Sequence, residues 1–109
     1  MANADHYTYR VAFSPEDGEY IGTVAEFPSL SWLAPSKVAA LEGIGAVVAD
    51  VLEDMAASGE VTPEPIGDRQ FSGRFQVRVL PEVHRALVTR AAEQNVSLNR
   101  CISDRLSSV

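Results

Sequence analysis

Alternation of apolar and polar residues is strictest at residues 73–79. The apolar positions are Phe75, Val77 and Val79, and the polar positions between them are Arg74, Gln76 and Arg78. Successive side chains of a strand point to opposite faces, so the pattern predicts a strand with one apolar face. Arginine and glutamine are suited to reading guanine and adenine edges in the major groove, which makes the polar face a candidate for base recognition. A solvated edge strand is the alternative.

Two helical patterns follow this strand. Pro81 suits the first turn of a helix, where its missing N–H costs nothing. Val83, Leu87 and Ala91 then recur at helical spacing as far as Asn95, which is a plausible left-handed stop. Ser97 is expected to cap a second helix. That helix carries its apolar residues on one side, namely Leu98, Cys101, Ile102 and Leu106.

The unit at residues 71–109 contains one strand and two helices, and this composition predicts a dimer. A lone strand has unpaired edges, and a chain of about 40 residues seldom folds alone. Antiparallel pairing with the same strand of a second copy resolves both problems. The dimer core is then expected to contain Phe75, Val77, Val79, Leu87 and Ile102.

This order of elements resembles the ribbon-helix-helix family of Arc-type and MetJ-type repressors, and the resemblance covers roughly Phe71 to Ser107. It implies that Arg74, Gln76 and Arg78 read bases in the major groove. It also implies that the start of the second helix binds a phosphate through backbone N–H groups, for which helix N-termini are suited. The phosphate-binding residues would be Ser97, Leu98 and Asn99.

The first 60 residues predict an α+β fold, with a small antiparallel three-stranded sheet covered by one helix. The expected strands cover residues 7–13, 20–25 and 30–33, with a turn at Asp17 and Gly18. A helix capped by Ser36 is expected to run to about Ala57, because its apolar residues recur every three or four positions. Gly43 and Gly45 weaken this helix, and close packing against a strand is one reason to keep them.

Residues 61–70 read as a linker, because they contain two prolines, a glycine and no helical period. The expected organisation is a domain at 1–60, the linker at 61–70 and the ribbon-helix-helix unit at 71–109.

The stretch from Tyr7 to Pro65 is also similar to the N-terminal domain of HicB-type antitoxins. The residues that carry the similarity are Glu16 to Ile21, Glu26 to Leu30, Ala39 to Leu41 and Pro63 to Pro65. The similarity implies a partial RNase H-like fold and a partner, a small basic HicA-type ribonuclease toxin. Candidate anchors for that toxin are Phe27, Leu30 and Trp32. Many members carry a Gly-Cys pair and a Gly-x-Thr element before the helix, and this chain has Ser29-Leu30 and Ala34-Pro35-Ser36 instead.

Charge divides the chain unevenly. Residues 1–70 hold three basic and twelve acidic groups, a net charge of −9, whereas residues 71–109 hold six arginines and three acidic groups, a net charge of +3. The split indicates nucleic acid as a partner of the basic part and a basic protein as a partner of the acidic part. The alternative is that the acidic charge only keeps the first domain soluble.

Composition and motifs exclude several classes. No apolar run approaches the roughly 18 residues of a membrane helix, and the single cysteine, with no signal region, favours the cytoplasm. Residue spacing shows no metal motif, phosphate loop or catalytic triad, so no cofactor and no enzymatic activity are expected. Asp50 and Asp54 lie one helical turn apart and are interpreted as a solvated surface.

The sequence therefore predicts an antitoxin that neutralises a HicA-type toxin, dimerises and represses its own operon by binding operator DNA. Assembly of the dimer into a higher oligomer is left open. One alternative is a dimeric ribbon-helix-helix regulator with a sensing N-terminal domain and no toxin. The other is a vestigial hydrolase whose DNA-binding part only localises it.

Overall fold

Strands β1 (Tyr9–Ser14), β2 (Glu19–Val24) and β3 (Ser31–Ala34) form an antiparallel sheet in the order β1-β2-β3. They belong to a computed structural model that describes residues 3–108. The turn between β1 and β2 contains Gly18 at a φ of +64°, a conformation that glycine adopts without strain. The three expected strands are thus confirmed, each shifted by one or two residues.

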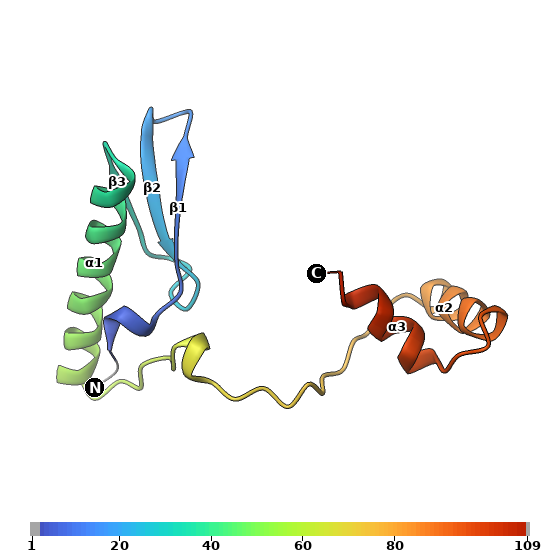
Figure 1. Ribbon diagram of the computed structural model, residues 1–109. Coiled ribbons are helices and arrows are strands. Elements are labelled where there is room, and N and C mark those ends of the chain that lie inside the picture. The colour runs from blue at the N-terminus through green and yellow to red at the C-terminus, as the bar shows by residue number, and fades with distance from the viewer. Residues whose placement is uncertain (1–2, 109) are drawn as a thin grey trace. The chain divides into compact units, whose positions relative to one another are not determined.

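Helix α1 (Lys37–Ala57) lies along one face of this sheet (Figure 1). The Ser36 hydroxyl accepts a hydrogen bond from the Ala39 N–H at 3.1 Å, which confirms the predicted N-cap. The helix ends at Ser58, and Gly59 follows at a φ of +75°. The residues of α1 that are buried against the sheet are Ala40, Ile44, Val48 and Leu52.

The core of this unit joins the helix to the sheet and to the segment before it. Ile44, Val48 and Leu52 are fully buried, and they form one cluster with two further buried residues, Val24 of β2 and Tyr7 before β1. Burying an aliphatic side chain of this size contributes about 1.5–3 kcal/mol, so this cluster is the main source of the unit's stability.

The register of the strands determines which side chains face α1. Val11, Gly22 and Trp32 lie opposite one another on neighbouring strands. A Cβ atom at Gly22 would lie 2.7 Å from the Ala40 carbonyl oxygen, so this row faces the helix at close approach. On the helix side, a Cβ at Gly43 would overlap the Trp32 indole. Close packing therefore explains Gly22 and Gly43, whereas Gly45 has open space around it.

Replacing Gly22 with alanine is expected to destabilise the first unit by about 1–3 kcal/mol, because the new methyl group meets helix backbone that cannot move aside cheaply. Gly45→Ala is the matched control, and it should stabilise α1 by up to about 1 kcal/mol. Chemical denaturation of the full chain measures both changes. Equal stability of the two variants would contradict the packing described for Gly22.

Part of the expected linker is bound to the first unit. The Tyr7 hydroxyl donates a hydrogen bond to the Pro63 carbonyl at 2.6 Å, and the Ile66 N–H donates to the Glu26 carboxylate at 2.8 Å. Two short 3-10 turns, Ala4–His6 and Ile66–Asp68, are joined by a contact of 2.9 Å between His6 Nδ1 and Asp68 Oδ2. The two compact units of the chain divide between Phe71 and Ser72.

The second unit contains α2 (Pro81–Glu93) and α3 (Leu98–Leu106), which pack on each other. Pro81 occupies the first helical position of α2, and Asn95 after its end adopts a left-handed φ of +57°. The Ser97 hydroxyl accepts the Arg100 N–H at 3.0 Å. The two helices and their predicted boundary residues are therefore confirmed.

The single chain forms no strand at residues 73–79, where the alternating pattern predicts one. A strand requires a hydrogen-bonded neighbour, and the sequence assigned that neighbour to a second copy. The strand and its pairing with a second copy therefore both stay predictions.

Candidate functional site

An exposed apolar segment precedes α2. Every residue from 71 to 80 is exposed, including Phe75 at 72% and Val77 at 65% of their surface. Val79 is 44% exposed and Leu80 63%. A soluble chain rarely leaves consecutive large apolar side chains in water, and such a patch is typical of a surface that binds another protein.

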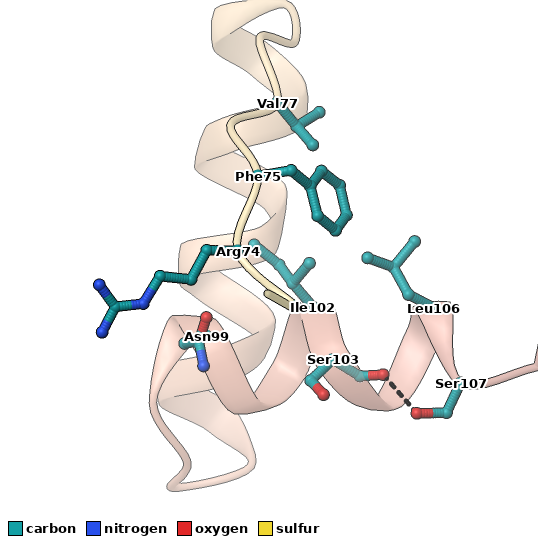
Figure 2. Close-up of a pocket in the computed structure, with 9 residues that line it drawn as sticks. Arg74, Phe75, Val77, Asn99, Ile102, Ser103, Leu106 and Ser107 are labelled. Atoms are coloured by element: carbon teal, nitrogen blue, oxygen red, sulfur yellow. Dashed lines mark hydrogen bonds between the residues drawn. The ribbon is translucent and has the colours of Figure 1, made fainter. Parts of the chain in front are cut away.

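Two apolar side chains of this segment, Phe75 and Val77, line an open groove of about 680 Å³ beside α3. Figure 2 shows Phe75 and Val77 pointing to the same side as Ile102 and Leu106 of α3. The structure thus brings together three of the residues predicted for the dimer core. Leu87 is half-buried in α2, and Val79 lies outside the lining of this groove.

The polar side chains of the segment are all exposed. Arg74 points away from Phe75 and Val77, as alternation along an extended chain requires (Figure 2). Gln76 and Arg78 are also exposed. The arrangement leaves all three predicted base-reading side chains free to contact a partner.

The start of α3 has the geometry of a capped helix. Ser97 is the N-cap, and Leu98 and Asn99 are the first two residues of the helix. The first N–H groups of a helix lack intrahelical partners, so they are available to an anion. The Arg100–Asp104 pair on the same helix, at 3.1 Å, is exposed on both sides and contributes little to stability.

The second unit has a very small core of its own. Among its described residues, only Ala91 and Cys101 are buried. Two small side chains contribute far less burial than a stable domain needs. The single chain therefore buries little apolar surface in this unit.

The predicted toxin anchors occupy different environments. Phe27 and Leu30 pack against the core, where the Phe27 and Tyr7 rings lie 5.5 Å apart. Trp32 lies against α1 at Gly43 and is 46% exposed. Packing within the first unit therefore accounts for Phe27 and Leu30, and Trp32 keeps the largest exposed surface of the three.

Glu26 binds residues 63–68, here called the exit segment, to the first unit. Its carboxylate accepts hydrogen bonds from the Thr8 N–H at 3.0 Å, the Thr8 hydroxyl at 3.0 Å and the Ile66 N–H at 2.8 Å. Burial raises the pKa of the Glu26 carboxyl, but these donors favour its charged form, and the pKa lies below its usual value. The carboxylate therefore stabilises the attachment of residues 63–68.

Glu26→Gln is expected to cost about 1 kcal/mol of stability at pH 7, since charge-assisted hydrogen bonds become neutral ones. Because the folded-state pKa is lowered, the stabilisation is complete above the unfolded-state pKa and is lost as the pH falls through the folded-state value. Thermal unfolding at several pH values from 7 to 3 should show the melting temperatures of the variant and the original chain becoming equal as the pH falls. Glu53→Gln, at an exposed position of α1, is the control and should show no such convergence.

Sequence reasoning missed one group, the apolar row Ala12, Ile21 and Leu33. These residues lie opposite one another on β1, β2 and β3. Ala12 is an apolar residue on the otherwise polar side of the first predicted strand. This departure from alternation was the signal in the sequence that could have indicated the row.

Within residues 3–108, no three His, Cys, Asp or Glu side chains are grouped as metal ligands. Asp50 and Asp54 are both exposed on α1. No helix of the described part of the chain is long and apolar enough to span a membrane.

Comparison with known proteins gives one family match. No curated protein and no solved structure matches the chain. Residues 57–106 match the model of the HicB family, which covers the end of α1, the exit segment and the second unit, and less than half of the chain. The match supports a HicB-type protein, and it suggests an antitoxin-like function with a toxin as partner.

Proposed function

We propose that this chain is an antitoxin that binds and neutralises a HicA-type ribonuclease toxin and represses its own operon as a DNA-binding dimer. The observation that carries the proposal is the exposed segment at residues 74–79, in which Phe75 and Val77 line the groove at α3 and Arg74 points away from both of them. The HicB family match covers this segment.

Dimerisation supplies the burial that the second unit lacks. Antiparallel pairing of residues 74–79 from two copies satisfies the backbone groups of both segments. It also covers Phe75 and Val77, and it closes the groove beside Ile102 and Leu106. The proposed architecture is the ribbon-helix-helix dimer.

The same pairing builds a DNA-reading surface. Two copies of Arg74, Gln76 and Arg78 lie on the outer face of the two-stranded ribbon, and such a ribbon fits the major groove. The N-terminus of α3 then binds backbone phosphate through its free N–H groups at Leu98 and Asn99. The net charge of +3 at residues 71–109 favours approach to DNA.

The first unit is the proposed toxin-binding part. It has its own core and a net charge of −9 over residues 1–70. A ribonuclease toxin binds RNA and so presents a basic surface. Opposite charges accelerate association of such partners, and apolar contacts are needed to hold them. The exit segment leads from this unit to the DNA-binding unit, so both partners are bound by one chain.

Gln76→Ala is expected to reduce the preference for operator over random DNA by about 1–3 kcal/mol, because it removes a base contact. Ser97→Ala should weaken binding to both DNAs about equally, since phosphates carry no sequence information. Titration of fluorescent duplexes of the upstream operon region and of scrambled sequence measures both ratios. An unchanged ratio for Gln76→Ala would show that the segment is not the reader.

The exposed segment at 74–79 equally fits a dimeric regulator that has no toxin. The two functions differ in genetic context and in binding. An adjoining reading frame for a small basic protein that binds this chain supports the antitoxin, and its absence supports the regulator.

A further inference from the structure

The sheet of the first unit has one uncovered face. Val11, Gly22 and Trp32 face α1, and neighbouring residues of a strand point to opposite sides. Ala12, Ile21 and Leu33 therefore form one row across all three strands on the face away from α1. No other described helix packs on the sheet.

This row departs from the usual pattern of a half-covered sheet. The solvent face of an antiparallel sheet is normally polar. Here its central row is apolar from edge to edge, and Leu33 exposes 43% of its surface. The rows on either side are mostly polar, with Arg10, Thr23 and Ser31 at one end and Ser14 and Glu19 at the other. An apolar centre with a polar rim is the anatomy of a protein-binding surface.

We propose that the open sheet face, defined by Ala12, Ile21 and Leu33, is the surface on which the basic toxin docks. This inference rests on the proposed function and adds the location of the binding site. The turn beside the row carries Glu16 and Asp17, next to Glu19 on the face itself. Together with the net charge of −9, these carboxylates favour a basic partner over a second copy of the same acidic unit.

Trp32 and Leu33 allow the two faces of the sheet to be tested separately, because they are neighbours in β3 and lie on opposite faces. They expose 46% and 43% of their surface. A toxin bound to the helix side of β3 contacts Trp32, and one bound to the open face contacts Leu33. The two sites are therefore distinguished by single substitutions of adjacent residues.

The experiment uses the full-length chain and the purified HicA-type protein encoded beside it, with calorimetric titration as the readout. Leu33→Lys is expected to raise the Kd at least about 10-fold, because it buries an unpaired charge in the apolar row of the interface. Val38→Lys is the matched control, since Val38 is an exposed apolar residue of α1, 67% exposed, and the change in net charge is the same. Trp32→Ala should leave the Kd within about 3-fold. Thermal unfolding verifies that each variant is folded.

The outcomes distinguish the proposed antitoxin function from the proposed docking site. No binding by the unmodified chain, or no adjoining toxin gene, overturns both the antitoxin function and this docking site. Normal binding by folded Leu33→Lys leaves the function standing and overturns the site, as does a loss of binding confined to Trp32→Ala. If Leu33→Lys instead lowers the oligomeric state of the chain without toxin, the face joins two copies and the proposal is wrong.

Discussion

Replacing Phe75 with glutamate is expected to abolish dimerisation and all operator binding of the full-length chain. Phe75 exposes 72% of its surface in the single chain, so the substitution costs the monomer little. In the proposed dimer the same position lies between two chains, and a buried unpaired carboxylate costs several kcal/mol. Sedimentation at micromolar concentration should show a monomer, with the second unit largely unfolded by circular dichroism.

Gln76→Glu is the matched control, because it places the same charge at the neighbouring position on the opposite side of the segment. It should leave the dimer intact and weaken only DNA binding, by repulsion from phosphate. A Phe75→Glu monomer that still binds the operator would show that a single copy is sufficient, and the paired ribbon would be wrong.

The full-length double variant Arg74→Ala/Arg78→Ala is expected to lose operator binding by at least about 100-fold, since each arginine contributes about 1–3 kcal/mol and occurs twice in a dimer. It should still neutralise the toxin, because the acidic charge and the core of the first unit are unchanged. Growth rescue during toxin expression measures neutralisation, and duplex titration measures DNA binding.

A fragment of residues 1–71 gives the reciprocal test, because the first compact unit ends at Phe71. Shown to be folded by its thermal transition, it should rescue growth without binding DNA. Failure of the folded fragment, with rescue by the double variant, would mean that neutralisation needs the DNA-binding unit.

Local chemistry was sufficient to predict the three helices of this chain and the three strands of its first unit. The hydroxyls of Ser36 and Ser97 cap the helices that they were expected to cap, and Asn95 has the left-handed φ expected of a helix stop. Caps and turns depend on residues within three or four positions, so a single sequence contains the whole interaction. The three-stranded sheet with one covering helix follows from the same kind of pattern.

The exit segment shows what local chemistry cannot determine. Its prolines and its lack of period predicted a linker, yet Tyr7 and Glu26 bind it at Pro63 and Ile66. These partners lie 56 and 40 residues away in the sequence. The composition of this segment indicates that it is not a helix, but it gives no information on hydrogen bonds to residues far away in the sequence.

For the candidate site, the alternating pattern was enough to predict two faces at residues 74–79, because alternation is a property of the extended backbone. It did not determine that Phe75 and Val77 face Ile102 and Leu106, since that depends on how the segment lies against α3. That Phe27 and Leu30 pack against the core likewise depends on the three-dimensional fold.

The row Ala12, Ile21 and Leu33 is the clearest case of a feature that depends on the three-dimensional fold. The sequence supplied three apolar residues at unremarkable positions in three separate strands. Strand register aligned them, and α1 covered the opposite face, where Gly22 allows its backbone to approach. A shift of one residue in either pairing would move a strand's side chains to the other face, so the row exists only because non-local pairing fixes the register.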